Sequence, residues 1–550
     1  MAVKIYSAQV LGLKANIVEV EIDLSQGLHS FSIVGLPDKS VEESKDRISA
    51  AIKNSGFISP QKKNQKVIVS LAPADLKKEG PVFDLPIALA YLLASKQIDF
   101  ETDKKLFIGE LSLDGTIRPV KGILSLTREA KKNGFKEVYI PKENAKEAAL
   151  IRDIVILPCG SLKDITNHFN KNIEFILNIQ SPTKIDFSCV DKPSTDFTDV
   201  KGQESAKRGL EIAAAGGHNV LMVGPPGTGK TMLAKAFASI LPPLDFEEML
   251  EVTAIHSVAG QMEDIVTSRP FRSPHHTSSY VALVGGGVYP KPGEITLSHC
   301  GVLFLDEFPE FERKVIESLR QPLEDRLVTV SRAKGTLSFP ASFILVCTMN
   351  PCPCGNFDGP KPCVCSQNAI NKYKRKISGP IMDRIDLWLD VPQIDIQKLS
   401  DFSDSGHKSV DIQKRVVKAR EIQRRRFNLK NNQSDQSENS DEMVGNSLDG
   451  KESNINRDEN VNKNNNSDNK KQGRHILTNS EMGVSEIKKH VELSPEVKKI
   501  LNQASERFNF SGRAYHSVIK LARTIADLDD KEDIEQNHIF EAIQYRPKQE

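Results

Sequence analysis

The feature that most constrains the fold of this chain is a glycine-rich octapeptide, Gly224-Pro225-Pro226-Gly227-Thr228-Gly229-Lys230-Thr231. It follows an apolar run, Asn219–Val223, and precedes a helical pattern that begins near Met232, so the sequence predicts a strand, a loop and a helix in succession. Glycines let backbone N–H groups turn inward around phosphates, and the helix N-terminus adds positive potential. We expect Lys230 to reach the outer phosphates of ATP and Thr231 to ligate Mg²⁺.

A second apolar run, Gly301–Leu305, ends at two adjacent acids, Asp306 and Glu307. Downstream of a phosphate-binding loop, we expect Asp306 to hold the Mg²⁺ shell and Glu307 to polarise the attacking water. The alternative is a pair of solvated surface acids, which is common in a chain with 73 acidic residues. The buried strand before them favours the catalytic interpretation.

A third apolar run, Ser342–Cys347, leads to Asn350. The amide of Asn350 both donates and accepts hydrogen bonds, so it can hold a water molecule against the γ-phosphate. Taken alone, Asn350 would instead be a turn residue before Pro351. Because ligands of open parallel sheets bind at the carboxyl ends of the strands, the three runs predict one shared crevice.

Two arginines are candidates for stabilising charge on the transferred phosphoryl group: Arg384 in Ser378–Asp386 and Arg513 at the start of a helix. A planar, always-charged guanidinium suits this task when a neighbouring subunit supplies it, which requires an oligomer. Taken singly, each arginine is better explained as a member of a surface ion pair. Only the presence of the other motifs in the same chain favours the catalytic role.

The length of 550 residues and the shifts in composition divide the chain into several domains. Segment 428–475 is rich in Asn, Asp, Ser and Lys and is expected to be disordered, because it cannot bury enough apolar surface. The predicted order is an α/β domain (1–175), a linker (176–199), a phosphate-loop α/β domain with a parallel sheet (200–395), the start of a helical lid (396–427), the Asn-rich insert (428–475) and a C-terminal helical lid (476–550).

Positive and negative side chains almost cancel, 74 against 73, so no overall field favours nucleic acid or membranes and any polyanion must bind a local patch. The N-terminus has no pattern of a secretory signal, and no run reaches membrane-spanning length. We therefore expect a cytoplasmic protein with no membrane association. Its eight cysteines are then expected to be reduced.

Several longer stretches are more specific than the phosphate-binding loop: Pro270–Thr277, Gly285–Phe311, Met349–Gly355, Ser378–Leu387 and Ala522–Leu528. With them the chain resembles the magnesium-chelatase-like AAA+ ATPases of bacteria, the YifB and ComM group, over nearly its whole length outside the Asn-rich insert. The resemblance implies an AAA+ core with a helical lid, a Lon-protease-like N-terminal domain of the ribosomal protein S5 domain 2-like type, and a hexameric ring.

By motif position, the resemblance makes Lys230 and Thr231 the Walker A residues and Asp306 and Glu307 the Walker B residues. It makes Asn350 the first sensor, Arg384 the arginine finger and Arg513 the second sensor. Members of this group that act in natural transformation are DNA helicases driving branch migration. The resemblance therefore implies DNA remodelling in recombination or transformation, and the alternative is a protein-remodelling or metal-chelatase-type ATPase.

The N-terminal domain raises the question of peptidase activity. Where Lon-type proteases have a nucleophilic serine after the stretch resembling Lys78–Pro81, this chain has Val82. Leu124 stands where those proteases have their lysine base. Valine cannot be acylated, so we expect a scaffold without peptidase chemistry.

Three weaker signals remain open. Four cysteines in a Gly/Pro-rich stretch, Cys352, Cys354, Cys363 and Cys365, are enough for a tetrahedral zinc site, or are four free or buried thiols. His275 and His276 either contact nucleic acid or order a hairpin. A basic run from Lys414 to Arg426 is either a DNA-binding patch or the solvated face of a lid helix.

Overall fold

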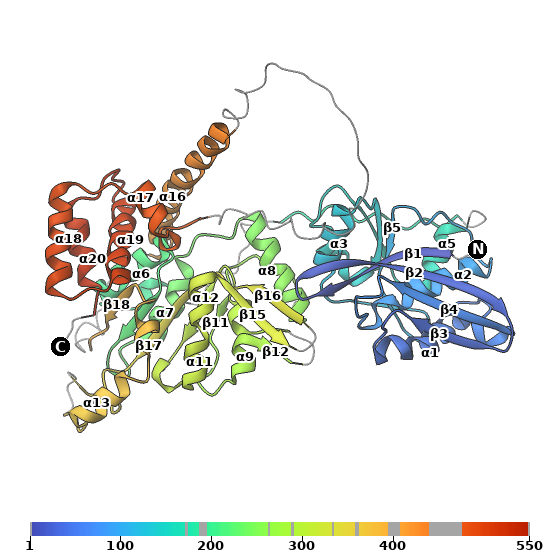
Figure 1. Cartoon of the computed structure of the whole chain (residues 1–550), viewed down its shortest axis with the longest axis horizontal. Coiled ribbons are helices and arrows are strands. Elements are labelled where there is room, and N and C mark those ends of the chain that lie inside the picture. The colour runs from blue at the N-terminus through green and yellow to red at the C-terminus, as the bar shows by residue number, and fades with distance from the viewer. Residues whose placement is uncertain are drawn as a thin grey trace, which may run out of the picture.

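The computed structural model describes residues 3–170, 174–185, 195–261, 264–287, 291–332, 335–357, 362–393, 408–438 and 476–547. Figure 1 shows an N-terminal α/β domain on the right, a central α/β domain, and a group of C-terminal helices on the left. Among the residues described, no helix is both long enough and apolar enough to cross a membrane.

The sheet of the N-terminal domain has seven strands in the order β3-β4-β2-β1-β5-β8-β9. From Val18 to Ile22 alternate residues of β2 are buried, which gives the period-two pattern of a strand with one face on a core. The strands of this domain, including the small β6–β7 pair, are β1 (Val3–Leu11), β2 (Lys14–Gln26), β3 (Ser30–Val34), β4 (Gln65–Ala72), β5 (Lys105–Phe107), β6 (Glu110–Leu111), β7 (Ile117–Arg118), β8 (Glu137–Pro141) and β9 (Val155–Cys159). Its α-helices are α1 (Lys39–Asn54), α2 (Asp84–Ala94), α3 (Ile123–Lys132), α4 (Ala145–Ala148) and α5 (Leu162–Phe169).

The central domain is built on a five-stranded sheet in the order β11-β14-β17-β10-β18, and each neighbouring pair is parallel. The residues of β14 and β17 are all buried, as expected for a parallel sheet that helices cover on both faces. The five strands are β10 (Val220–Val223), β11 (Phe271–Arg272), β14 (Val302–Leu305), β17 (Ile344–Met349) and β18 (Leu387–Asp390). Two hairpins lie outside this sheet, β12 (Gly285–Gly286) with β13 (Lys291–Pro292) and β15 (Leu327–Arg332) with β16 (Gly335–Pro340).

The α-helices of the central domain are α6 (Glu204–Gly216), α7 (Lys230–Ser239), α8 (Phe246–Ala259), α9 (Tyr280–Val284), α10 (Glu294–Leu297), α11 (Arg313–Ser318), α12 (Arg320–Asp325), α13 (Gln367–Lys374) and α14 (Gly379–Met382). The C-terminal helices are α16 (Ser409–Glu438), α17 (Val484–His490), α18 (Pro495–Arg507), α19 (Gly512–Leu528) and α20 (Gln536–Gln544). Helices α16 and α19 both pack on α6, and their buried side chains join one hydrophobic core with the sheet. The lid is therefore continuous with the central domain.

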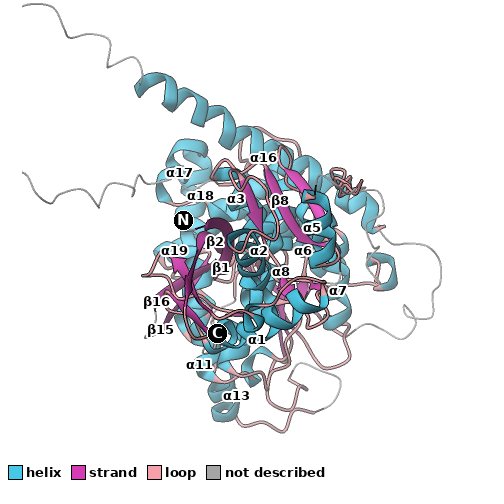
Figure 2. Cartoon of the chain, turned by 90° about the vertical axis from the view of Figure 1, so that its right-hand side faces the viewer, coloured by secondary structure: helices cyan, strands magenta, loops and turns pink. Residues whose placement is uncertain are grey.

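Helix α16 continues to Glu438 and extends beyond the rest of the molecule in Figures 1 and 2. The sequence instead predicts disorder from residue 428. The helix is already nucleated where Val416 and Ala419 are buried, so adding residues at its end costs far less than starting a helix. Residues 439–475 of the predicted insert lie outside the described residues, as do residues 396–407 of the predicted start of the lid.

The N-terminal domain docks on the central domain through α3 and α8, which lie side by side. Leu124 of α3 is 2% exposed and packs in one cluster with Met249 and Leu250 of α8. Beside this cluster the backbone N–H of Gly122 donates to Ser257 Oγ at 2.9 Å. Leu124, the residue that the resemblance sets at the position of the Lon lysine base, thus lies in the contact between the two domains, and half-buried Val82 offers no hydroxyl.

Candidate nucleotide site

The glycine-rich loop follows β10 directly and leads into α7, which begins at Lys230, two residues before the predicted start near Met232. Gly227 and Gly229 have φ values of +78° and +87°, a region that L side chains rarely adopt. Gly224 is needed for a different reason, since a Cβ there would lie 2.1 Å from the backbone oxygen of Val391. No side chain caps α7 at Gly229, which leaves its first turn for an anionic ligand.

Lys230 lies inside this loop and also reaches the end of a neighbouring strand. Its Nζ donates to the backbone oxygens of Gly224 and Pro225 at 2.6 and 2.7 Å and to Asn350 Oδ1 at 3.3 Å. Burial lowers the pKa of this ammonium, while the charges of Asp306 and Glu307 oppose that shift. The structure therefore brings the loop lysine and the predicted sensor amide together.

Asp306 follows β14, and its two carboxylate oxygens accept hydrogen bonds from different elements. Thr231 Oγ1 donates to Asp306 Oδ2 at 3.0 Å, and Thr348 Oγ1 donates to Oδ1. The backbone N–H of Glu307 in turn donates to Thr348 Oγ1 at 3.1 Å. Thr348 thus contacts both acids. The motifs do not predict this role, although a polar residue in an otherwise apolar strand is a signal for it.

Glu307 is exposed and adopts a left-handed backbone conformation with φ of +53°, which is rare for a residue other than glycine. His276 Nδ1 lies 3.9 Å from the Glu307 carboxylate. His275 instead accepts from the backbone N–H of Thr277 and lies close to the hydroxyl of the same residue. Of the two predicted alternatives for this histidine pair, the contacts favour ordering of a turn, with His276 placed beside Glu307.

Arg384 and Arg513 do not join this cluster. Arg384 Nη2 donates to Glu324, and Arg513 Nη2 donates to the same carboxylate at 2.9 Å. Arg384 also donates to the backbone oxygen of Pro380 at 2.6 Å. Hydrogen bonding to Arg384, together with the nearby positive charge of Arg513, lowers the pKa of Glu324. The two arginines therefore converge on one acid at the end of α12.

The register of the sheet places this arginine pair away from the loop. β18 runs parallel to β10, with Val220 opposite Leu387 and Val223 opposite Asp390. Arg384 comes just before β18, at the amino ends of the parallel strands. The glycine-rich loop follows β10, at their carboxyl ends. The length of a four-residue strand, about 13 Å, therefore separates the two. A nucleotide in the loop is consequently out of reach of Arg384 of the same chain.

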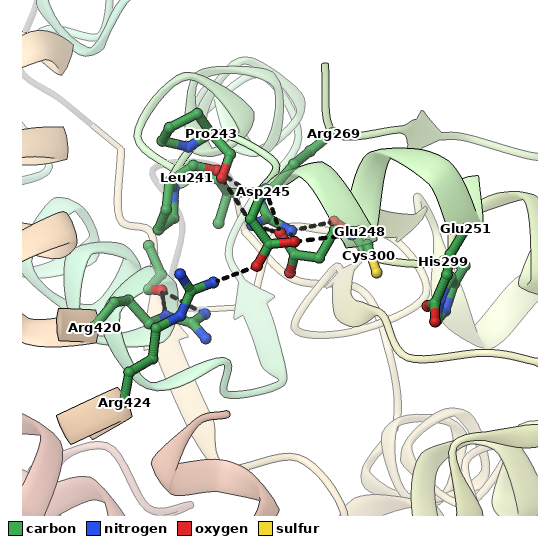
Figure 3. Close-up of polar contacts among 12 residues, drawn as sticks. Leu241, Pro243, Asp245, Glu248, Glu251, Arg269, His299, Cys300, Arg420 and Arg424 are labelled. Atoms are coloured by element: carbon green, nitrogen blue, oxygen red, sulfur yellow. Dashed lines mark hydrogen bonds and ion pairs between the residues drawn. The ribbon is translucent and has the colours of Figure 1, made fainter. Parts of the chain in front are cut away.

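A cavity of about 1300 Å³ also lies away from the loop, between the central domain and α16. Figure 3 shows Arg420 and Arg424 reaching from α16 toward the start of α8, where Arg424 pairs with Asp245 at 3.1 Å. Arg420 donates to the backbone oxygen of Ala214 at 2.9 Å, and burial lowers the pKa of its guanidinium to about 10. Arg269 pairs with Glu248 at 2.8 Å on the same wall. The contacts of Arg420 and Arg424 join the lid to the central domain, and none of these contacts includes a residue of the predicted nucleotide site.

Glu251, His299 and Cys300 come close together beside this cavity. His299 uses both ring nitrogens, because the backbone N–H of Ser342 donates to Nδ1 at 3.0 Å and Nε2 lies 3.1 Å from Glu251 Oε2. Burial raises the pKa of the Cys300 thiol well above its usual range and opposes the thiolate form. Both ring nitrogens of His299 therefore already have partners within the chain, which is typical of a structural cluster.

The basic run of α16 is largely paired within the chain. Side chains of the run contact acids as follows: Lys414 with Asp411, Arg415 with Glu211, Lys418 with Asp530, Arg424 with Asp245, Arg425 with Glu421 and Arg426 with Asp527. These contacts favour the lid-helix alternative over a DNA-binding patch.

The four cysteines Cys352, Cys354, Cys363 and Cys365 converge, with sulfur atoms all within 4.8 Å of one another.

Comparison with known proteins identifies the family. The profile described as magnesium chelatase, subunit ChlI, matches residues 196–399, and two further profiles, for subunit ChlI of Mg-chelatase and for the ChlI C-terminal region, match residues 20–144 and 450–546. Competence protein ComM of Haemophilus influenzae is 39% identical over 547 residues, 98% of this chain and 97% of ComM. The chain belongs to the magnesium chelatase ChlI-like family. The family match makes it an AAA+ ATPase.

Other relatives agree with this assignment. Protein YifB of Escherichia coli is 38% identical over 545 residues, 98% of this chain and 96% of YifB. Lon protease 2 of Bacillus subtilis is 30% identical over 146 residues, 25% of this chain and 26% of the protease. The similarity to Lon accords with the α/β fold of the N-terminal domain of this ChlI-like protein.

We predict that Lys230→Ala abolishes nucleotide binding and that Glu307→Gln binds ATP yet hardly hydrolyses it. Lysine supplies charge to the phosphates in both the ground and transition states, whereas Glu307 acts on the attacking water alone. Binding of a fluorescent ATP analogue and phosphate release, measured on the same preparations, separate the two effects. Undiminished turnover in Glu307→Gln would show that another residue is the base.

We predict that Thr348→Val lowers ATP turnover by roughly tenfold or more while ATP binding is retained, because Asp306 and the backbone of Glu307 lose the hydroxyl that orients them. Thr296→Val is the matched control: Thr296 is buried and its hydroxyl has no hydrogen-bond partner within the described structure. Steady-state phosphate release compares the two variants. Equal turnover in Thr348→Val and Thr296→Val would remove Thr348 from the site.

Proposed function

We propose that this protein is a ring-forming, cytoplasmic AAA+ ATPase that couples ATP hydrolysis to DNA remodelling, as a helicase or branch-migration motor in recombination or natural transformation. The observation that carries the ATPase part is the convergence of Lys230, the Thr231–Asp306 pair and Asn350 at the carboxyl ends of β10, β14 and β17. The DNA part is supported by near full-length similarity to a competence protein.

In this proposal the residues of the octapeptide Gly224–Thr231 surround the phosphates of ATP, and Lys230 neutralises their charge. A hydroxyl and a carboxylate 3.0 Å apart, Thr231 and Asp306, offer the oxygen ligands that Mg²⁺ prefers. Magnesium held by these two side chains would neutralise charge that develops on the phosphates. Glu307 accepts a proton from the attacking water, and Asn350 orients that water.

The position of the arginines supports a multisubunit arrangement. Arg384 and Arg513 lie together at Glu324, on the edge of the sheet opposite the nucleotide. We infer that they serve a nucleotide bound by an adjacent copy, with Arg384 as the arginine finger and Arg513 as the second sensor. A closed ring with one site at each interface, a homohexamer, gives every nucleotide such a neighbour.

A second candidate function is a protein-remodelling or metal-chelatase-type ATPase. The matching family profiles carry the description magnesium chelatase, and the basic residues of α16 between Lys414 and Arg426 largely contact acids of the same chain. Under this alternative the N-terminal domain docks a protein partner. The two functions differ in what stimulates ATP turnover.

We predict that DNA raises ATP turnover and that the stimulation collapses at higher salt, because phosphate contacts release counterions. Phosphate release is measured with single-stranded DNA, duplex DNA and a four-way junction in turn, at two salt concentrations, with Glu307→Gln as the background control. Turnover that ignores all three DNAs and responds only to a protein partner would favour the alternative function.

We predict that Arg384→Ala folds and assembles but turns over ATP slowly, and that mixing it with Glu307→Gln restores part of the activity. In a mixed ring, some interfaces combine Glu307 from one variant with Arg384 from the other. Phosphate release by rings dissociated and reassembled together, compared with each variant alone, measures the rescue. No rescue in rings shown to be mixed would exclude a finger that acts between subunits.

A further inference from the structure

The sulfur atoms of Cys352, Cys354 and Cys363 form a nearly equilateral triangle. The separation is 3.4 Å between Cys352 and Cys354, and Cys363 lies 3.7 Å from each of them. The sulfur of Cys365 joins them within 4.8 Å. Four thiolates around one tetrahedral zinc ion, with Zn–S bonds of about 2.3 Å, place their sulfurs about 3.8 Å apart.

The separations fit neither a disulfide nor an iron–sulfur cube. A disulfide would bring two sulfurs to about 2.05 Å. An iron–sulfur cube would hold them further apart, because each sulfur would bind a different iron. Ordinary cysteine packing is also a poor explanation, since only Cys352 is buried and the other three are partly exposed.

The surroundings of Cys352 resemble those of a metal-bound thiolate. The backbone N–H of Phe357 donates to its sulfur at 3.4 Å, a contact that orients a ligand from outside the coordination shell. The residues described between β17 and α13 form neither a helix nor a strand. A short, irregular segment of this kind buries few apolar side chains of its own. A structural metal is a common means of holding such a segment in one conformation.

The cysteine turn is joined to the nucleotide site at two places. Cys352 follows Asn350 by two residues along the chain. Gly355, with φ of +79°, packs so closely on the glycine-rich loop that a Cβ would lie 2.7 Å from Pro226 Cδ and 3.9 Å from Asn350 Cγ. Anything that fixes this turn therefore also fixes one wall of the loop and the amide of Asn350.

We propose that Cys352, Cys354, Cys363 and Cys365 bind one zinc ion, and that this ion holds Asn350 and the Pro226 side of the glycine-rich loop in place. Metal binding stands on the sulfur geometry alone. Its effect on catalysis rests on the proposed ATPase function. Zinc here is structural, because four protein ligands leave no coordination position for water or substrate.

The test measures the zinc content of the purified full-length chain and of the double variant Cys354→Ser/Cys363→Ser by mass spectrometry. Cys159→Ala, which removes a buried thiol of the N-terminal domain, is the control. We expect about one zinc per chain in the wild type and the control and none in the double variant. Chains grown with cobalt should show the visible bands of a tetrahedral thiolate site, again lost only in the double variant. A wild-type chain that takes up neither metal would overturn the site.

The link to the nucleotide site is tested on the same proteins by binding of a fluorescent ATP analogue and by phosphate release. We expect roughly tenfold or greater loss of turnover in the double variant, with its circular dichroism unchanged, because Asn350 is displaced. A zinc-free variant that binds and hydrolyses ATP like the wild type would overturn the link and leave the zinc site standing. A zinc-loaded wild type without ATP turnover would refute the proposed function instead, while analogue binding would still report on the wall of the loop.

Discussion

The parallel pairing of β10, β14 and β17 is the constraint on which the nucleotide site depends. It brings the ends of three strands, far apart in the chain, to one edge of the sheet. There the Asp306 carboxylate accepts a hydrogen bond from Thr231 on one side and from Thr348 on the other. One buried-strand register therefore sets Lys230, the two acids and the amide of Asn350 relative to one another, so a shift by one residue would disperse them.

The opposite edge of the sheet is held by a buried polar network. Asp386 accepts from Ser517 of α19 at 2.7 Å and lies 3.1 Å from His218, whose other ring nitrogen contacts Thr524 of α19 at 2.9 Å. Burial alone would raise the pKa of Asp386, but the His218 hydrogen bond and nearby charges hold it at about 2. Because Asp386 is two residues from Arg384, this network fixes the lid and the arginine pair together. A single chain thus has the glycine-rich loop at one end of the parallel strands and the two arginines at the other.

Local pattern was sufficient to predict the elements that carry the site. The apolar runs before Gly224, Asp306 and Asn350 are strands, and a helix follows the glycine-rich loop, because each signal lies within a few residues of what it specifies. The same reasoning could not assign Thr348, whose hydroxyl matters only because β14 lies beside β17. Nor could it show that the basic run of α16 is largely paired with acids on other elements, such as Glu211 and Asp527.

By itself the sequence determined the chemistry available to this protein: a glycine-rich loop of the kind that predicts phosphate binding, two acids behind a strand, and four thiols in one short stretch. These are local properties, fixed by side-chain type and by hydrophobic period. Only the tertiary structure decided which groups meet. It gathered the four sulfurs in one cluster and packed the neighbouring Gly355 on the glycine-rich loop. It also placed Leu124 in the contact between domains and set Arg384 and Arg513 on one acid away from that loop. Contacts of this kind depend on how helices and strands pack across long separations, which no local pattern encodes.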